Sequence, residues 1–203
     1  LLVKAEEEFG TVDVLVNNAG MHSRGDLETV DPADVGAMVD INIRAPLVLS
    51  CAAIPYLRRS GGGGIVMVGS LAGMAPLQGA ATYSGTKAGL RAFAYALADE
   101  MRGTRIHVGV VSPGPIDTGF IMDEIDKVED IVFSQPMSSP GDVADAVLKI
   151  AAGDKLEIPM PAASGKLTNL GYLFPRLRRY LRPKLYAKGR KNKDKYRNRQ
   201  VNE

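Results

Sequence analysis

The sequence is poor in the residues that form disulfides or bind transition metals. Cys51 is the one cysteine among 203 residues, and His22 and His107 are the two histidines. A single cysteine excludes an internal disulfide and a cysteine-based zinc cluster. Two histidines leave too few ligands for a histidine-based metal site. We therefore expect no metal, and a chain that folds without an oxidising compartment.

Long apolar runs are also missing. No run reaches the ~20 apolar residues that span a bilayer; the best one, residues 45–57, is too short and contains a serine and two prolines. The first ten residues are acidic, unlike a signal peptide, and do not begin with methionine. These absences predict a cytoplasmic protein, and they suggest that the sequence starts inside a helix of a longer chain.

The composition is that of a soluble globular domain of ordinary size, with 45% hydrophobic and 24% charged residues. The net charge of +2 conceals an asymmetry. Residues 176–203 carry 12 Lys and Arg against 2 Asp and Glu, whereas residues 1–175 carry 13 against 21. We expect a folded domain over 1–165 and a helical, basic extension over 166–203, with its last part disordered.

Predicted strands and helices alternate along the chain. Short, β-branched apolar runs predict buried strands at 12–16, 65–68, 106–111 and 156–158. Longer patterns predict helices at 31–59, 82–101, 140–153 and 167–179. Gly61–Gly64 suggests a hinge, and residues 119–139 suggest a mobile loop with a short helix. This order predicts an α/β fold with a parallel sheet that is covered on both faces.

Tyr83 and Lys87 stand four residues apart in a predicted helix and so share one of its faces. A nearby cation favours the phenolate and lowers a tyrosine pKa that is normally about 10. Such a tyrosine exchanges a proton near neutral pH. The same spacing is also common in surface pairs without a catalytic role, so the pair alone leaves both interpretations open.

Polar and turn-forming residues follow three predicted strands. Asn17 to Gly20 follow the first, Ser70 follows the second, and Pro113 to Thr118 follow the third. Each segment by itself is also typical of an ordinary turn or a helix cap. The carboxyl ends of parallel strands lie at one edge of the sheet, where open α/β folds bind their ligands. Together they predict one site.

With these pieces the sequence resembles the classical short-chain dehydrogenase/reductase family. The likeness covers residues 1 to about 155 and rests on pieces in family order and spacing: Asn17-Asn18-Ala19-Gly20, Asn42, Ser70, Tyr83-x-x-x-Lys87 and Pro113-Gly114. It implies a Rossmann-like doubly wound parallel sheet. It also implies an NAD(P)(H)-dependent oxidoreductase that interconverts a carbonyl and an alcohol by hydride transfer.

The resemblance implies a role for each residue. Tyr83 would be the general acid in reduction and the base in oxidation, and Ser70 would hydrogen-bond the carbonyl oxygen. Lys87 would lower the Tyr83 pKa and hold the nicotinamide ribose, while Asn42 would hold a water. Gly20 would let the cofactor approach, because it has no Cβ. The full set of expected cofactor contacts is Asn17, Ala19, Gly20, Tyr83, Lys87, Pro113, Gly114, Ile116 and Thr118.

The family's Gly-rich turn is absent before Asn17, and Gly61–Gly64 does not replace it because it precedes a strand. The resemblance thus implies that roughly 70 residues are missing, that the sheet is incomplete, and that strand 12–16 is an exposed edge. The choice between NAD and NADP is not readable. Alternatives to the oxidoreductase are a non-catalytic fragment that binds or regulates, and an epimerase or dehydratase on the same fold.

The expected substrate is a small carbonyl or alcohol. Residues 120–122, with Phe133 and Met137, either line a pocket for an apolar substrate or pack a lid. The resemblance implies a homodimer or homotetramer through the long helices. The tail over 166–186 mixes leucines and tyrosines with cations, which suits weak contact with an anionic membrane surface. We favour instead that 166–181 packs near the substrate mouth and 187–203 is solvated, and no nucleic-acid pattern is present.

Overall fold

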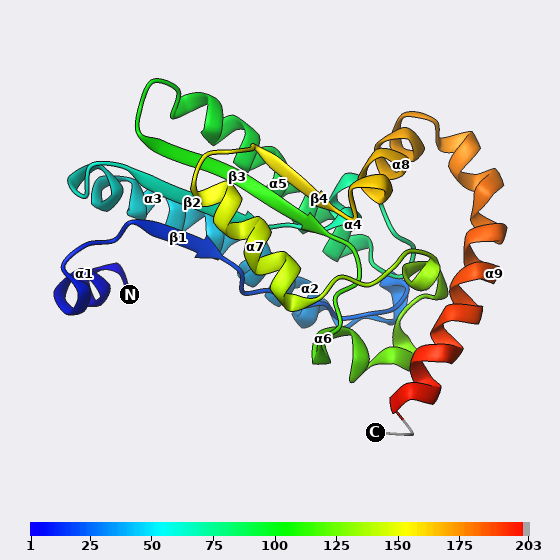
Figure 1. Cartoon of the computed structure of the whole chain (residues 1–203). Coiled ribbons are helices and arrows are strands. Elements are labelled where there is room, and N and C mark those ends of the chain that lie inside the picture. Colours follow the sequence, from blue (N-terminus) through cyan, green and yellow to red (C-terminus); the bar gives the residue numbers. More distant parts are fainter. Residues whose placement is uncertain (201–203) are drawn as a thin grey trace.

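The computed structural model describes residues 1–200 and shows a parallel sheet with helices on both faces (Figure 1). Its four strands lie in chain order, each paired with the next: β1 (Val14–Asn17), β2 (Gly63–Val68), β3 (Ile106–Pro113) and β4 (Glu157–Met160). The main helices between them are α3 (Ala45–Arg59), α5 (Ala81–Glu100) and α7 (Pro140–Ala151). The predicted α/β class, with a parallel sheet and alternating strands and helices, is confirmed.

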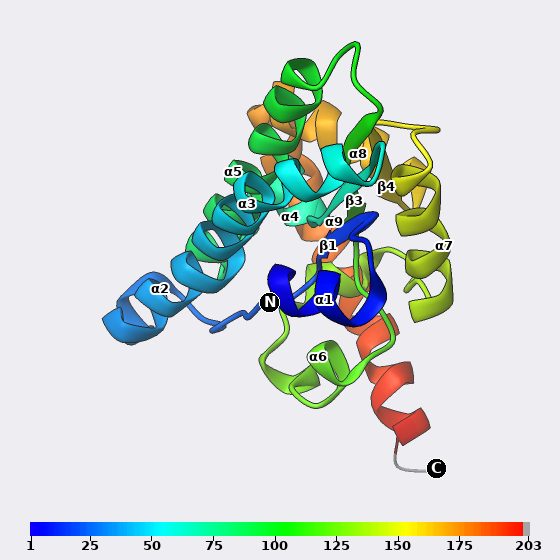
Figure 2. The ribbon, with the colours of Figure 1, turned by 90° about the vertical axis from the view of Figure 1, so that its left-hand side faces the viewer.

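The sheet separates two apolar layers, as Figure 2 shows with α3 and α5 on one side and α7 on the other. Ile65 and Met67 of β2 point into the layer beneath α3 and α5, where they pack with Leu57 and Leu90. Val66 points to the opposite face and packs under α7. Both faces of β2 are therefore buried, which explains its unbroken apolar run.

Strand β1 forms one edge of the sheet. Leu15 is buried in the layer beneath α3 and α5, whereas Val14 and Val16 on the other face are 46% and 41% exposed. Helix α7 packs on β2, β3 and β4. The predicted exposed apolar edge is present in the structure.

The glycines before β2 mark a close crossing of the chain. Gly62 and Gly63 have φ values of 136° and 148°, and a Cβ on Gly62 would lie 2.6 Å from the backbone oxygen of Arg105. Both the positive φ values and the clash of a Cβ with the neighbouring backbone require glycine here. The run predicted to be a hinge is thus a tightly packed junction between α3 and β2.

The predicted helix over 31–59 is continuous, but its middle is wound differently from its ends. It consists of α2 (Pro32–Val39), the π-helical turn η2 (Asp40–Arg44) and α3. By length and composition its 28 residues would suffice to span a membrane, contrary to the prediction from apolar runs. Core helices of folded domains meet the same criterion, and this helix packs on β1, β2 and α5.

The connections at the carboxyl ends of the strands are short helices rather than open loops. They comprise α4 (Leu71–Met74), α6 (Gly119–Met122), η3 (Ile125–Lys127) and η4 (Asp130–Ser134). Ile125, Val128 and Phe133 form a small core of their own there. The segment predicted to be mobile is therefore packed. Helices α1 (Leu2–Phe9) and η1 (Leu27–Thr29) complete the described elements before α2.

The C-terminal extension forms two helices, α8 (Ala162–Leu173) and α9 (Pro175–Gln200). Residues 187–200, which we expected to be disordered, belong to α9 in the structure, and residues 201–203 lie outside the described part. Lys193 is 5% exposed and donates to the carbonyl oxygen of Val128 at 2.6 Å. It also pairs with Asp130 at 3.3 Å. Such docking contacts hold α9 in place, and the helix continues through Pro183.

Candidate active site

A cavity of about 760 Å³ lies at the carboxyl ends of β1, β2 and β3. Segments that follow these strands form one side, and α8 and α9 form the other. The cavity brings together most of the residues predicted from the sequence: Ala19, Gly20, Ser70, Tyr83, Lys87, Pro113, Gly114, Ile116 and Thr118. The expectation that three strand ends build one site agrees with this geometry.

Two predicted site residues do not line this cavity. The Asn17 side-chain amide donates to Ser50 Oγ at 3.1 Å and to Met67 Sδ at 3.2 Å, inside the protein core. Asn42 is fully buried, and its amide accepts from the Met21 backbone nitrogen and donates to the Met21 backbone oxygen, both at 2.8 Å. Asn17 thus ties the end of β1 to α3 and β2, and Asn42 holds the backbone at Met21. Asn18 lines the cavity.

Lys87 projects from α5 to the carboxyl end of β2. Its ammonium donates to the carbonyl oxygen of Val68 at 2.8 Å and lies 5.8 Å from the centroid of the Tyr83 ring. The side chain is only 4% exposed, and this burial lowers the pKa of Lys87 to about 8. One of its three N–H bonds is thus engaged by Val68, and the others remain for a ligand.

Ser70 caps the short helix α4, where its hydroxyl accepts from the backbone nitrogen of Ala72 at 3.1 Å. A Cβ on Gly73 would lie 2.6 Å from the backbone of Lys87, so only glycine allows α4 to lie this close to α5. The close packing brings Ser70 to Tyr83. Burial raises the pKa of Tyr83, and a hydrogen bond with Ser70 and the charge of Arg24 act in the opposite direction.

His22 and Arg24 belong to the site, although the sequence did not reveal them. The His22 ring stacks on the Tyr83 ring with centroids 4.2 Å apart and planes inclined by 12°. Arg24 contacts His22 Nδ1 at 2.9 Å. Since arginine only donates, Nδ1 accepts and the ring carries its proton on Nε2. Burial is the main cause that lowers the pKa of His22 to about 4.

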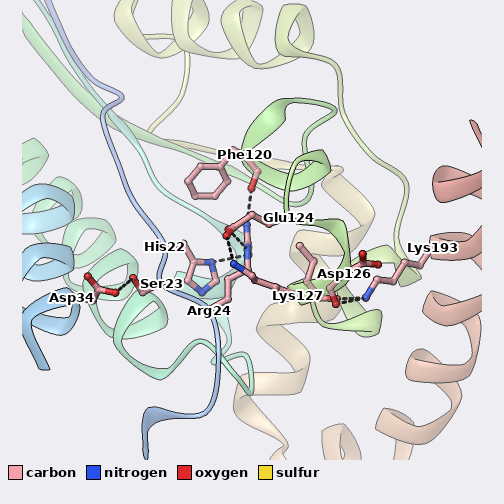
Figure 3. A network of polar contacts seen from close by, with 10 residues as sticks. His22, Ser23, Arg24, Asp34, Phe120, Glu124, Asp126, Lys127 and Lys193 are labelled. Carbon is pink, nitrogen blue, oxygen red and sulfur yellow. Dashed lines mark hydrogen bonds and ion pairs between the residues drawn. The ribbon is translucent and has the colours of Figure 1, made fainter. Parts of the chain in front are cut away.

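Figure 3 shows how Arg24 joins two segments of the cavity wall. Its side chain is 7% exposed and pairs with the Glu124 carboxylate at 3.3 Å. It also donates to the carbonyl oxygen of Phe120 at 2.7 Å. Arg24 follows the Asn-Asn-Ala-Gly segment by four residues, and this proximity is the one signal that the sequence offered for it.

The cavity fits the nicotinamide and ribose end of NAD(P)(H). A Cβ on Gly20 would lie 3.2 Å from Asn42 Oδ1 and 3.4 Å from Lys87 Nζ, so glycine leaves room for these two side chains. The Lys87 ammonium offers donors suited to ribose hydroxyls. Ile116 and Thr118 lie on the same wall and suit contact with a carboxamide-bearing ring.

Comparison with known proteins agrees with this geometry. The family model described as short chain dehydrogenase matches residues 1–129. The ketoacyl reductase HetN of Nostoc sp. is 31% identical over 159 residues, covering 78% of this chain and 54% of that protein. An uncharacterized oxidoreductase of Staphylococcus saprophyticus is 36% identical over 120 residues, covering 58% of this chain and 49% of that protein.

A solved structure shares the fold. The 3-ketoacyl-(acyl-carrier-protein) reductase from Brucella melitensis, complexed with NADH, superposes with a TM-score of 0.70 at 25% identity. The match covers 78% of this chain and 69% of that one. The chain spans about half the length of the first curated relatives that it matches. The family match and the shared fold show that the chain belongs to the short-chain dehydrogenase family of oxidoreductases, whose Rossmann-type sheet binds NAD(P)(H).

Proposed function

We propose that the protein interconverts a carbonyl and an alcohol by hydride transfer, with Tyr83 as the general acid in reduction and the base in oxidation. The observation that carries the proposal is the convergence of Ser70, Tyr83 and Lys87 on one cavity at the strand ends. Ser70 lowers the pKa of Tyr83 there, and the Lys87 ammonium lies 5.8 Å from the centroid of the Tyr83 ring.

Each residue then has a distinct task. The bound cofactor supplies or accepts the hydride. Ser70 and Tyr83 hold the carbonyl oxygen through their hydroxyl groups, where negative charge develops in reduction. Tyr83 gives its proton to that oxygen, and the positive charge of Arg24 favours the phenolate that remains. Lys87 binds the ribose with the N–H bonds that Val68 does not engage.

The remaining predicted residues act around these. Ala19, Gly20, Pro113, Gly114, Ile116 and Thr118 form the proposed cofactor wall. Asn17 and Asn42 are proposed to act through the backbone, since Asn42 clamps Met21 directly after Gly20. The water-holding role of Asn42 would require it to release Met21 or Thr86, to which its amide also donates at 3.2 Å.

Tyr83→Phe tests the proposal, because it keeps the ring and its stack on His22 but removes the transferable proton. We expect turnover to fall by ~10²–10⁴ while cofactor binding survives. The assay follows NADH and NADPH oxidation with a panel of aryl and aliphatic ketones in the full-length protein. Tyr56→Phe, at a half-buried position of α3 that does not line the cavity, is the matched control. Turnover in Tyr83→Phe close to that of the control would refute the assignment.

A second candidate is a non-catalytic binding module. Such a module would hold a ligand in the same cavity without reacting with it. The two candidates differ in one measurement. Turnover by the chain in its full-length context supports the enzyme, and saturable ligand binding without turnover supports the binding module.

For assembly we propose a homodimer or homotetramer through the long helices. Val39, Ile41 and Val48 are 43%, 39% and 60% exposed along the helix over 32–59, although all three are apolar. Burial of such side chains favours association.

A further inference from the structure

The wall of the Tyr83 cavity has an unusual balance of charge. Among the described residues that line it there is no aspartate or glutamate, and there are four cations. Arg24 and Lys87 lie beside Tyr83, while Arg178 and Lys188 come from α9. Arg24 is paired with Glu124, so the net positive charge at the cavity comes from Lys87, Arg178 and Lys188. Low-dielectric walls concentrate the field of such charges.

Five cations of α9 fall into two groups that differ in their partners. Arg190, Lys193 and Arg197 form ion pairs with the carboxylates of Asp126 and Asp130, outside the cavity. Arg178 and Lys188 have no ion pair within residues 1–200, and Arg178 donates only to the carbonyl oxygen of Pro76, at 3.2 Å. The first group docks the helix, and the second group leaves two positive charges free at the cavity.

Between these two charges, the face of α9 is apolar. Leu181 and Leu185 lie between Arg178 and Lys188 at spacings of three and four residues, and all four line the cavity. Ten residues of helix separate the two cations by ~15 Å along its axis. The sequence suggested that these leucines contact a membrane surface, but in the structure they line the cavity, with a cation at each end.

The opposite wall is apolar as well. Leu71 and Leu77 lie there on the α4 side, with Ile116 and Ile121 nearby. A volume of about 760 Å³ falls within the usual range for small-molecule sites and exceeds what one reacting carbonyl group requires. The ligand that fits this wall has a long or broad apolar body and one anionic end.

Position separates the α9 cations from the proposed cofactor wall. Helix α9 packs on α8 and η4, and α8 packs on β4. Strand β4 is the edge of the sheet opposite β1, and Figure 1 shows α9 standing on the outer side of α8 and α4. The residues that follow β1, Ala19 and Gly20, are the ones we assign to the cofactor.

We propose that the substrate of the Tyr83 site is an amphipathic anion: an apolar ketone or alcohol whose carboxylate or phosphate, remote from the reacting oxygen, binds Arg178 or Lys188. This inference rests on the proposed function, which supplies the reacting oxygen at Tyr83. The apolar body of the substrate lies against Leu181 and Leu185, and its anionic end fixes how far the substrate enters the cavity. The two cations therefore select for length as well as for charge.

Direct binding tests the charge preference without turnover. The probes are a dansylated eleven-carbon fatty acid and its methyl ester, which share the apolar body and differ in the carboxylate. Fluorescence titration compares their affinities for the wild-type chain and for Arg178→Gln/Lys188→Gln. The matched control is Arg179→Gln/Lys191→Gln, which removes the same charge from exposed positions of α9 that do not line the cavity.

We expect the wild type and the control to bind the acid about tenfold more tightly than the ester, the scale of one charge-assisted contact. The double variant at the cavity should bind the two probes about equally. No saturable binding of the acid, equal binding of both probes by the wild type, or an equal loss in the control would overturn the inference. The Tyr83→Phe assay measures turnover, so the proposed function fails or survives independently.

Discussion

Gly189 is the point where α9 passes closest to η4. A Cβ at this position would lie 2.6 Å from the carbonyl carbon of Asp130 and closer still to its oxygen, and 3.2 Å from the backbone nitrogen of Ile131. These are backbone atoms, so no side-chain rotation relieves the contact. In Gly189→Ala the helix must move away from η4, and the Lys193 ammonium then loses its 2.6 Å contact with Val128.

The magnitude follows from two opposing effects. Alanine is favoured over glycine inside a helix by up to ~1 kcal/mol, while overpacking costs ~1–3 kcal/mol and a buried cation that loses its partners costs ~3–5 kcal/mol. The clash therefore dominates at Gly189. Gly171 in α8 is the matched control, because its Cβ would meet only the Arg178 side chain, at 3.7 Å or more. Gly171→Ala should be neutral or stabilising by ~0.5 kcal/mol.

Limited digestion with trypsin measures the difference, since α9 offers many lysines and arginines. Mass spectrometry would identify the first cuts. We expect cleavage within α9 to accelerate at least tenfold in Gly189→Ala and to stay at the wild-type rate in Gly171→Ala. If both variants resist trypsin equally, the close docking of α9 on η4 is refuted.

Three further predictions concern ionisable groups around Tyr83. Burial lowers the pKa of His22 from 6.5 to about 4, so between these pH values the unfolded chain binds more protons, and acidification should cost up to ~3 kcal/mol of stability. His22→Phe should reduce this loss of stability in urea unfolding, and an unchanged loss would contradict the prediction. Burial lowers the pKa of Lys87 from 10.5 to about 8, so wild-type stability should rise between those pH values; Lys87→Met should abolish the rise and weaken cofactor binding. Arg24 favours the Tyr83 phenolate, so Arg24→Gln should move the pH–rate profile of oxidation to higher pH. Arg102→Gln, at an exposed position, is the control, and the same shift there would show a general charge effect.

The sheet was predictable because its strands are apolar runs bounded by glycine, proline or asparagine. The same holds for the meeting of Ser70, Tyr83 and Lys87, since parallel strands deliver their ends to one edge. The inward direction of Asn17 was predictable too, although it was missed. Side chains two residues apart in a strand share a face, so Asn17 follows Leu15 toward α3 and contacts Ser50 there.

The part that local sequence does not contain is tertiary pairing. The run of cations in α9 is typical of a solvated face, and nothing near it shows that Asp126 and Asp130 lie opposite. Only the folded chain brings residues about 60 to 70 positions apart into ion pairs. Likewise the stack of His22 on Tyr83 joins segments that share no periodic pattern, so Arg24 could not be recognised as the cation that acts on Tyr83.

The ion pairs of α9 give this helix a different response to ionic strength from that of the sheet. Apolar layers hold the sheet, and salt at physiological concentration does not weaken them. Helix α9 relies partly on charge pairs such as Arg190 with Asp130, whose arginine side chain is 73% exposed. High salt weakens such exposed pairs. Salt therefore acts more strongly on the docking of α9 than on the packing of the sheet, and we expect the binding of large ligands between them to depend on ionic strength.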